Sequence, residues 1–109
     1  KGDGIQSLVL KIDLDSNSVK NILFRWKSRP NTLAFIAGKH EGKPHLSLLI
    51  SEDLVSEKSW DAGAILRNWA KAIQGGGGGQ KFFATAGGKR IEGLGEAMDL
   101  ARNWIKNNS

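Results

Sequence analysis

Residues 75 to 88 read Gly-Gly-Gly-Gly-Gly-Gln-Lys-Phe-Phe-Ala-Thr-Ala-Gly-Gly, and no other segment of the chain is as informative about chemistry. Five consecutive glycines are costly to order, because glycine loses more backbone freedom on folding than any other residue. A flexible linker would continue into serine, proline or charge, whereas here an apolar run follows directly. Backbone amides left bare by glycine can surround a phosphate. The segment predicts a phosphate contact made by the amides of Gly76, Gly77, Gly78 and Gly79, or else a close approach of helix, strand and loop.

Basic residues gather on both sides of this run and near the end of an earlier predicted helix. The chain has 16 Lys and Arg against 11 Asp and Glu, a net charge of +5. A basic domain favours polyanionic partners through phosphate contacts. The segregation of the charges indicates a basic face. The side chains that are candidates for contacting phosphates of such a partner are Gln80, Lys81, Lys71, Lys89, Arg90, Arg25, Lys27 and Arg29.

Several kinds of catalytic and cofactor site are not supported by the sequence. The glycine run lacks the Gly-Lys-Ser/Thr ending of a Walker A loop, and it follows a predicted helix where a dinucleotide-binding fingerprint follows a strand. The two histidines, His40 and His45, flank a predicted turn and are expected to be solvated, so no metal site is predicted. We expect no catalytic residue in this segment.

The elements that must position these residues follow from hydrophobic periodicity and from breaker residues. Helices alternate with strands, which predicts an α/β (α+β) fold with one mixed sheet and helices packed on it, in the order β-α-β-β-α-β-α. The two middle strands should pair as an antiparallel hairpin. The expected elements are a strand over 5–14, a helix from Asp15 to about Lys27, strands over 32–37 and 45–51, a short polar helical turn or loop over 52–58, a helix from Asp61 to Ile73 ended by Gly75, a strand over 81–86 and a helix over 94–105.

Four tryptophans accompany this pattern. Trp26, Trp69 and Trp104 lie on helical apolar stripes, so we expect them to pack in the core. Trp60 precedes the expected N-cap Asp61 and fits the position of a hydrophobic staple, with an exposed stacking platform as the alternative. Phe82 and Phe83 should point to opposite faces of their strand.

Length and composition indicate one domain over residues 1–109. The chain has no cysteine and no apolar stretch near the about 20 residues that a membrane span needs, so we expect a cytoplasmic protein without membrane partners. It starts with Lys1 in place of methionine, and we expect it to be a fragment of a longer protein.

The segment from Gly77 to Gly88 resembles the glycine-rich signature of the DHHA1 domain. In the C-terminal domains of bacterial alanyl-tRNA synthetases this signature reads Gly-Gly-Gly-Arg-Pro-x-x-Ala-x-x-Gly-Gly, or has one further residue before the paired glycines, as here. The preceding Asp61-Ala62-Gly63, the amphipathic helix that follows it and the closing helix are also similar to that family. Gln80 and Lys81 stand where the family has Arg-Pro.

The resemblance implies a tRNA-binding accessory domain of an alanine–tRNA ligase. Such domains contact the elbow of the L-shaped tRNA and help to deliver one tRNA to both the aminoacylation and the editing domains. The implied partners are tRNA(Ala) and other domains of the same chain. The ATP, magnesium and zinc of the parent enzyme would belong to those other domains, and this segment is expected to hold no cofactor.

Two further functions stay open. In a dimerisation or interaction module, forming a homodimer, the glycine run would serve tight packing between helix, strand and partner. The third reading is the nucleic-acid-gripping domain of a DHH-type phosphodiesterase. In those enzymes a histidine follows the glycines, where this chain has Gln80.

Overall fold

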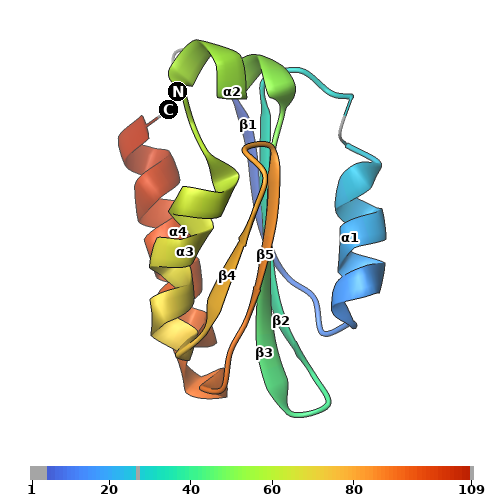
Figure 1. Cartoon of the computed structure of the whole chain (residues 1–109), viewed down its shortest axis with the longest axis vertical. Helices are drawn as coiled ribbons and strands as arrows, with labels where there is room; N and C mark the ends of the chain where they lie inside the picture. Colours follow the sequence, from blue (N-terminus) through green and yellow to red (C-terminus); the bar gives the residue numbers. More distant parts are fainter. Residues whose placement is uncertain (1–4, 27, 109) are drawn as a thin grey trace.

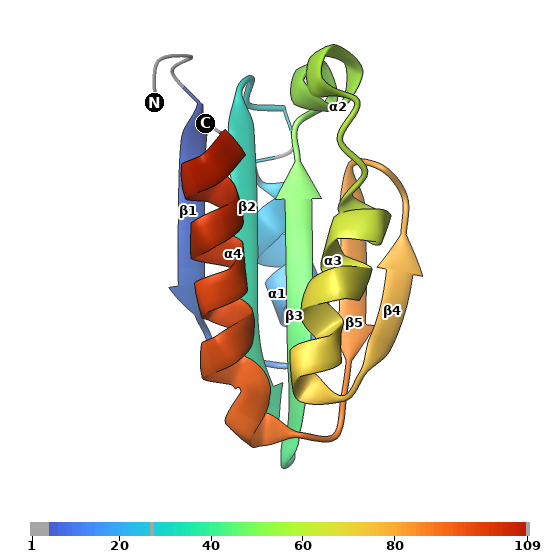
Figure 2. The same ribbon diagram turned by 90° about the vertical axis from the view of Figure 1, so that its left-hand side faces the viewer.

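Five strands form one mixed sheet in the order β1-β2-β3-β5-β4 (Figures 1 and 2). The computed structural model of the chain describes residues 5–26 and 28–108. Strand β1 pairs in parallel with β2, and every other neighbouring pair is antiparallel. The strands are β1 (Gln6–Lys11), β2 (Thr32–His40), β3 (Lys43–Ile50), β4 (Gly76–Gly79) and β5 (Phe83–Gly87).

Helices cover both faces of this sheet. Helix α1 (Ser16–Phe24) lies on one face, while α3 (Ala62–Ala70) and α4 (Leu94–Asn108) lie side by side on the other (Figure 1). The short α2 (Glu52–Lys58) sits at one end of the sheet. Single-turn 3₁₀ helices, η1 (Lys71–Ile73) and η2 (Ile91–Gly93), follow α3 and precede α4. The arrangement confirms the predicted mixed sheet with helices packed on it. Within the described residues, no helix is both long enough and apolar enough to cross a bilayer.

The structure adds the strand β4 to the predicted order, and the segment predicted as a helical turn or loop over 52–58 is the helix α2. The β2–β3 hairpin is also tighter than predicted, because pairing continues to His40 and Lys43 and leaves only Glu41 and Gly42 in the turn. Gly75 was expected to end the preceding helix in the left-handed conformation. Gln74 takes that conformation instead, with φ 52°.

The sheet separates two hydrophobic clusters. Alternate residues of each strand face opposite sides, so α3 and α4 cover one set and α1 covers the other. The larger cluster, on the α3–α4 side, includes Phe35, Leu48, Leu66, Ile73 and Ala101. The smaller cluster, under α1, consists of Val19, Leu23, Ala34, Ile36 and Leu49, with Leu8, Trp26 and Phe83 packed against it.

Three of the tryptophans pack in the larger cluster. Trp69 is buried and meets Phe35 edge to face at 5.1 Å between ring centroids, and Trp60 meets Trp104 in the same way at 4.8 Å. The predicted cap of α3 is confirmed, because Asp61 Oδ1 accepts a hydrogen bond from the Ala64 amide at 3.2 Å. Trp60 therefore joins the start of α3 to α4 through an aromatic contact.

The glycine run, expected to be a loop, is the edge strand β4, paired antiparallel with β5. A Cβ at Gly77 would overlap the Thr85 carbonyl oxygen and come within 2.5 Å of the Ala86 Cβ. A Cβ at Gly79 would lie 2.5 Å from the Phe83 carbonyl oxygen. By contrast, a Cβ at Gly76 would have no heavy atom within 4 Å. Alternate glycines of the strand thus let it approach β5 more closely than side chains would allow.

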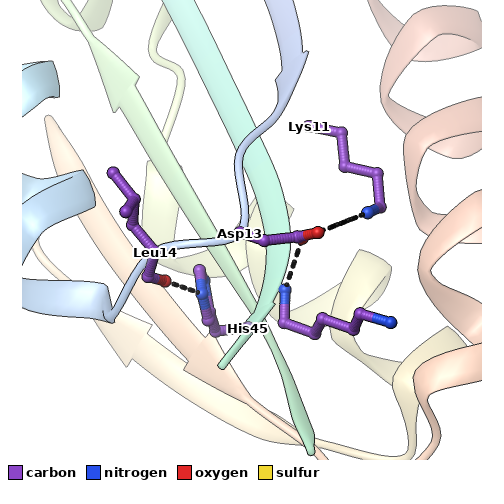
Figure 3. Close-up of polar contacts among 5 residues, drawn as sticks. Lys11, Asp13, Leu14 and His45 are labelled. Atoms are coloured by element: carbon purple, nitrogen blue, oxygen red, sulfur yellow. Dashed lines mark hydrogen bonds and ion pairs between the residues drawn. The ribbon is translucent and has the colours of Figure 1, made fainter. Parts of the chain in front are cut away.

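The connection from β1 to α1 is held against the far end of β2 and β3 (Figure 3). Asp13 Oδ1 accepts hydrogen bonds from Lys11 Nζ and from the Lys39 amide, each at 3.1 Å. Leu14 brings its carbonyl oxygen to 2.6 Å from His45 Nε2, so that ring nitrogen carries the proton and donates. His45 was expected to be solvated, and it is buried under this connection because β3 begins two residues before it.

Substituting Gly77 should destabilise the fold, whereas substituting Gly76 should not. Gly77→Ala places a methyl group against the β5 backbone, so we expect it to lower the free energy of unfolding by about 1–3 kcal/mol. Gly76→Ala meets open space and should change it by less than about 1 kcal/mol. Urea unfolding followed by tryptophan fluorescence measures both. Equal stability of the two variants would contradict the close approach of β4 to β5.

Asp13 should contribute stability that depends on pH. Its hydrogen bond from Lys11 and that from the Lys39 amide hold the pKa of Asp13 below its usual value of 3.8. A carboxylate with a lowered folded-state pKa stabilises the fold above the unfolded-state pKa and loses that contribution as the pH falls through the folded-state pKa. The stability difference between the wild type and Asp13→Asn should therefore be larger near neutral pH than below about pH 3. Urea midpoints at the two pH values test this, and a difference independent of pH would exclude it.

Candidate nucleic-acid interface

Two long segments of the chain contain no acidic residue. The first runs from residue 16 to residue 40 and the second from residue 62 to residue 91. They hold ten of the 16 basic residues: Lys20, Arg25, Lys27, Arg29, Lys39, Arg67, Lys71, Lys81, Lys89 and Arg90. Lys27 lies outside the described residues.

The two acid-free segments meet in a groove on the α1 face of the sheet. The groove has a volume of about 260 Å³ and separates α1 from the hairpin of β4 and β5. Phe24 of α1 meets Phe83 of β5 edge to face at 5.0 Å, and Lys20 Nζ lies 5.4 Å from the Phe24 ring centre. Its lining consists of Lys20, Phe24, Gly78, Gly79, Gln80, Phe82, Phe83, Ala84 and Thr85. We call this the α1–hairpin groove.

The strand conformation of the glycine run decides which amides can reach a ligand. The Gln80 amide donates to the Phe83 carbonyl oxygen at 2.8 Å. This hydrogen bond fixes which residues of β4 form backbone hydrogen bonds with β5. In an antiparallel pair every second residue bonds to its neighbour strand, so Gly76 and Gly78 pair with β5. Gly77 and Gly79 then point their amides away from β5, and Gly79 lies against Gly63 of α3. Neighbouring amides in a strand point in opposite directions, so these four cannot converge on one phosphate as a loop could.

The other candidate residues fall into two groups at opposite ends of α3. The tip group, Gln80 and Lys81, is exposed at the turn of the β4–β5 hairpin, where the Lys81 carbonyl accepts from the Ala62 amide at 2.9 Å. The base group, Lys71, Lys89 and Arg90, lies beside η1, and the Ile73 carbonyl accepts from the Lys89 and Arg90 amides, each at 2.9 Å. At about 1.5 Å of rise per residue, Ala62 and Ile73 lie roughly 17 Å apart.

The arginines differ in how far their side chains are engaged. Arg90 Nη1 donates to the Ala72 carbonyl at 3.1 Å and lies 3.8 Å from Glu96 Oε1, so Arg90 joins η1 to α4. Arg25 and Arg29 are exposed beyond the C-terminal end of α1, which lies toward the same end of the molecule as the hairpin tip (Figure 1). The structure thus brings Arg25, Arg29 and the tip group toward one end and leaves the base group at the other.

Acidic groups near α1 are already engaged. Asp13 is bound by Lys11, as described above, and the Ser18 hydroxyl donates to Asp15 Oδ1 at 2.6 Å. That hydrogen bond holds the pKa of Asp15 below its usual value. Both carboxylates are therefore charged at neutral pH, but they lie toward the N-terminal end of α1, away from Arg25 and Arg29. No group of three or more His, Cys, Asp or Glu side chains placed to hold a metal ion occurs in residues 5–26 and 28–108.

Sequence reasoning missed Lys20 and Phe24 as lining residues of the groove. Phe24 lies outside the apolar stripe of α1, so the helical periodicity did not predict where its exposed ring would pack. The length of the acid-free segments is the signal that would have pointed to Lys20. Of the two phenylalanines expected to face opposite sides of their strand, Phe83 packs against Phe24 of α1.

Comparison with known proteins identifies the domain. The family model of the DHHA1 domain matches residues 3–107. The alanine–tRNA ligase of Christiangramia forsetii is 45% identical over 105 residues, which is 95% of this chain and 12% of that protein. The alanine–tRNA ligase of Parabacteroides distasonis is 41% identical over 107 residues, which is 96% of this chain and 12% of that protein.

A solved structure shares the fold. The C-Ala domain of Aquifex aeolicus alanyl-tRNA synthetase superposes with a TM-score of 0.75 at 23% identity, covering 90% of this chain and 86% of that one. The chain thus spans about an eighth of the length of the ligases it matches. The resemblance seen in the glycine-rich signature is confirmed over nearly the whole chain, and the chain belongs to the DHHA1 domain family, in the branch found in bacterial alanyl-tRNA synthetases.

Proposed function

We propose that this domain is the tRNA-binding accessory domain of an alanine–tRNA ligase and that it holds tRNA(Ala) at the elbow. The observation that carries the proposal is the meeting of two acid-free, basic segments at the α1–hairpin groove. Folded RNA is recognised through phosphates, 2′-hydroxyls and stacking on exposed bases. The groove offers a cation, aromatic rings and a strand with little side-chain bulk, which suit those three kinds of contact.

The two faces of the sheet differ in their acidic residues, and we assign RNA binding to the α1 face. On the α3–α4 side, η2 and α4 carry Glu92, Glu96 and Asp99, while α2 at the end of the sheet carries Glu52, Asp53 and Glu57. A polyanion approaching that side would meet these carboxylates, whereas α1 carries none. Electrostatic steering therefore favours an approach from the α1 side.

The remaining parts of the proposal concern the longer protein. By holding the elbow, the domain would keep one tRNA attached while its acceptor end moves between the aminoacylation and editing domains. The affinity of this domain would then add to that of the other domains through a raised effective concentration. ATP, magnesium and zinc are assigned to those other domains.

Charge reversal beside the α1–hairpin groove should weaken tRNA binding more than charge reversal elsewhere on the surface. We expect Lys20→Glu with Lys81→Glu to weaken binding of a tRNA(Ala) transcript at least tenfold. The slope of log K against log salt should fall by roughly 1–2 between about 50 and 200 mM, since each lost phosphate contact removes slightly less than one unit. Fluorescence anisotropy with labelled tRNA and the 109-residue chain measures both quantities.

The matched control is Arg102→Glu with Lys106→Glu on α4, which changes the net charge by the same amount at exposed positions. This pair should change the affinity no more than about twofold. Equal losses in both pairs would show that only net charge matters. Salt-independent binding, or none by the wild type combined with a concentration-dependent dimer in sedimentation, would favour the dimerisation module.

The base group gives a third pair, Lys71→Glu with Lys89→Glu. Glu96 lines the same cavity as Lys71, and Glu92 follows Lys89 by three residues, so acidic groups weaken the local attraction for phosphate. We therefore expect this pair to weaken tRNA binding by a smaller factor than reversal of Lys20 and Lys81. A larger loss of affinity would show that the RNA-binding surface lies at the C-terminal end of α3, beside Lys71 and Lys89.

A further inference from the structure

A second cavity lies at the other border of α1, next to the free edge of the sheet. It has a volume of about 230 Å³ and is lined by Gln6, Ser7, Leu8, Trp26, Arg29 and Thr32. Pockets for drug-sized ligands usually measure about 300–1,000 Å³, so this cavity has room for one small ring system. We call it the Trp26 pocket.

An aromatic ring and a guanidinium group form one side of the pocket. Trp26 is half-buried against the cluster under α1, and the Arg29 guanidinium carbon lies 5.9 Å from the Trp26 ring centre. Arg29 is exposed and has no carboxylate partner among the described residues. Trp26 likewise has no side-chain hydrogen bond there, so its indole N–H is available. Stacked indole and guanidinium groups are surfaces on which nucleobases pack.

The backbone of the edge strand forms the opposite side. The Gln6 amide donates to the Asn31 carbonyl at 2.7 Å, and the Ile12 amide donates to the Ala37 carbonyl at 2.9 Å, so the even-numbered residues of this segment bond toward β2. Because β1 is the last strand of the sheet, the alternation turns the N–H and C=O of Ser7 toward the free edge. A neighbouring donor and acceptor of this kind match the hydrogen-bonding edge of a base.

Basic side chains outnumber acidic ones around the pocket, although the Asp53 carboxylate lies nearby, where it accepts a hydrogen bond from the Asn31 amide at 3.0 Å. The pocket belongs to the acid-free segment of α1, and Arg25 is exposed one residue before Trp26. The Gln6 side chain is exposed and lies on the α1 face together with Leu8. A phosphate next to a bound base would meet Arg25 or Arg29, while the base itself would stack on Trp26.

From these observations we propose that the Trp26 pocket receives one unpaired nucleobase of the bound tRNA. The inference rests on the proposed function and adds a contact that charge alone does not supply. Stacking is weakly dependent on salt, whereas phosphate contacts are strongly dependent on it. The pocket therefore predicts a loss of affinity without a change in salt dependence.

Trp26→Ala should weaken binding of the tRNA(Ala) transcript about tenfold or more, as expected for the loss of one stacked base, and leave the salt slope unchanged. Trp26→Phe should keep the affinity within about threefold, because a phenyl ring still stacks. Footprinting with dimethyl sulfate and a 2′-hydroxyl acylating reagent should show one nucleotide that the wild type protects and Trp26→Ala does not.

Gln6→Phe provides a variant that leaves Trp26 in place. A phenyl group at this exposed position would occupy the pocket and should cause the same loss of affinity and of the same footprint, even where Trp26→Ala fails to fold. Asn103→Phe on the outer side of α4 is the matched control and should bind as the wild type does.

The outcomes separate the two proposals. Wild-type binding with a steep salt slope, together with unchanged affinity and footprint in both Trp26→Ala and Gln6→Phe, overturns the pocket and leaves the proposed function standing. Absence of wild-type binding overturns the proposed function and the pocket with it. Loss of affinity in both variants with loss of one protected nucleotide supports the pocket.

Discussion

The close approach of the glycine strand β4 to its neighbours is the constraint on which the rest of the structure depends. Gly77 and Gly79 leave no room for a Cβ against β5, and Gly63 of α3 lies against Gly79. At the other end, a Cβ at Gly75 would overlap the Gly87 carbonyl, and one at Gly88 would overlap the Ile73 carbonyl. Both ends of α3 are thus held to the β4–β5 hairpin through bare backbone. Ordering this many glycines costs conformational entropy, and burial of Ala84, Ala86 and Ile73 in the larger hydrophobic cluster opposes that cost.

This packing also determines what the hairpin can present to a partner. Because α3 covers β4 and β5 from one side, the opposite side of the hairpin is left to form a groove with α1. The same arrangement separates the charges, since α1 and the hairpin are free of acidic residues while α2 and α4 carry many. In the proposed RNA complex, the glycine run would therefore act mainly through the shape of the hairpin. It does not supply four amides to one phosphate.

Much of the fold follows from the sequence, but the strand β4 does not. The stripe of Val19, Leu23 and Trp26 predicted α1, and Asp61 marked the start of α3, because helical periodicity and capping are local signals. Glycine carries no side chain and is depleted in strands, so no pattern in residues 76–79 indicates pairing, which depends on β5. The burial of His45 was missed for a similar reason, since it depends on a connection more than 30 residues away along the chain. The sequence predicted that the candidate site is basic and that it includes the segment that forms the β4–β5 hairpin. The contribution of Lys20 and Phe24 could not be predicted, because it depends on how α1 packs beside that hairpin.

Hydrogen–deuterium exchange of the chain with and without tRNA(Ala) tests the central claim most directly, because it maps the protected surface without any substitution. If RNA lies on the α1 face, amides of residues 16–26 and of the hairpin over 76–85 should exchange more slowly in the complex, while those of α4 should not change. Protection concentrated on α2 and α4, with α1 and the hairpin unchanged, would contradict the account.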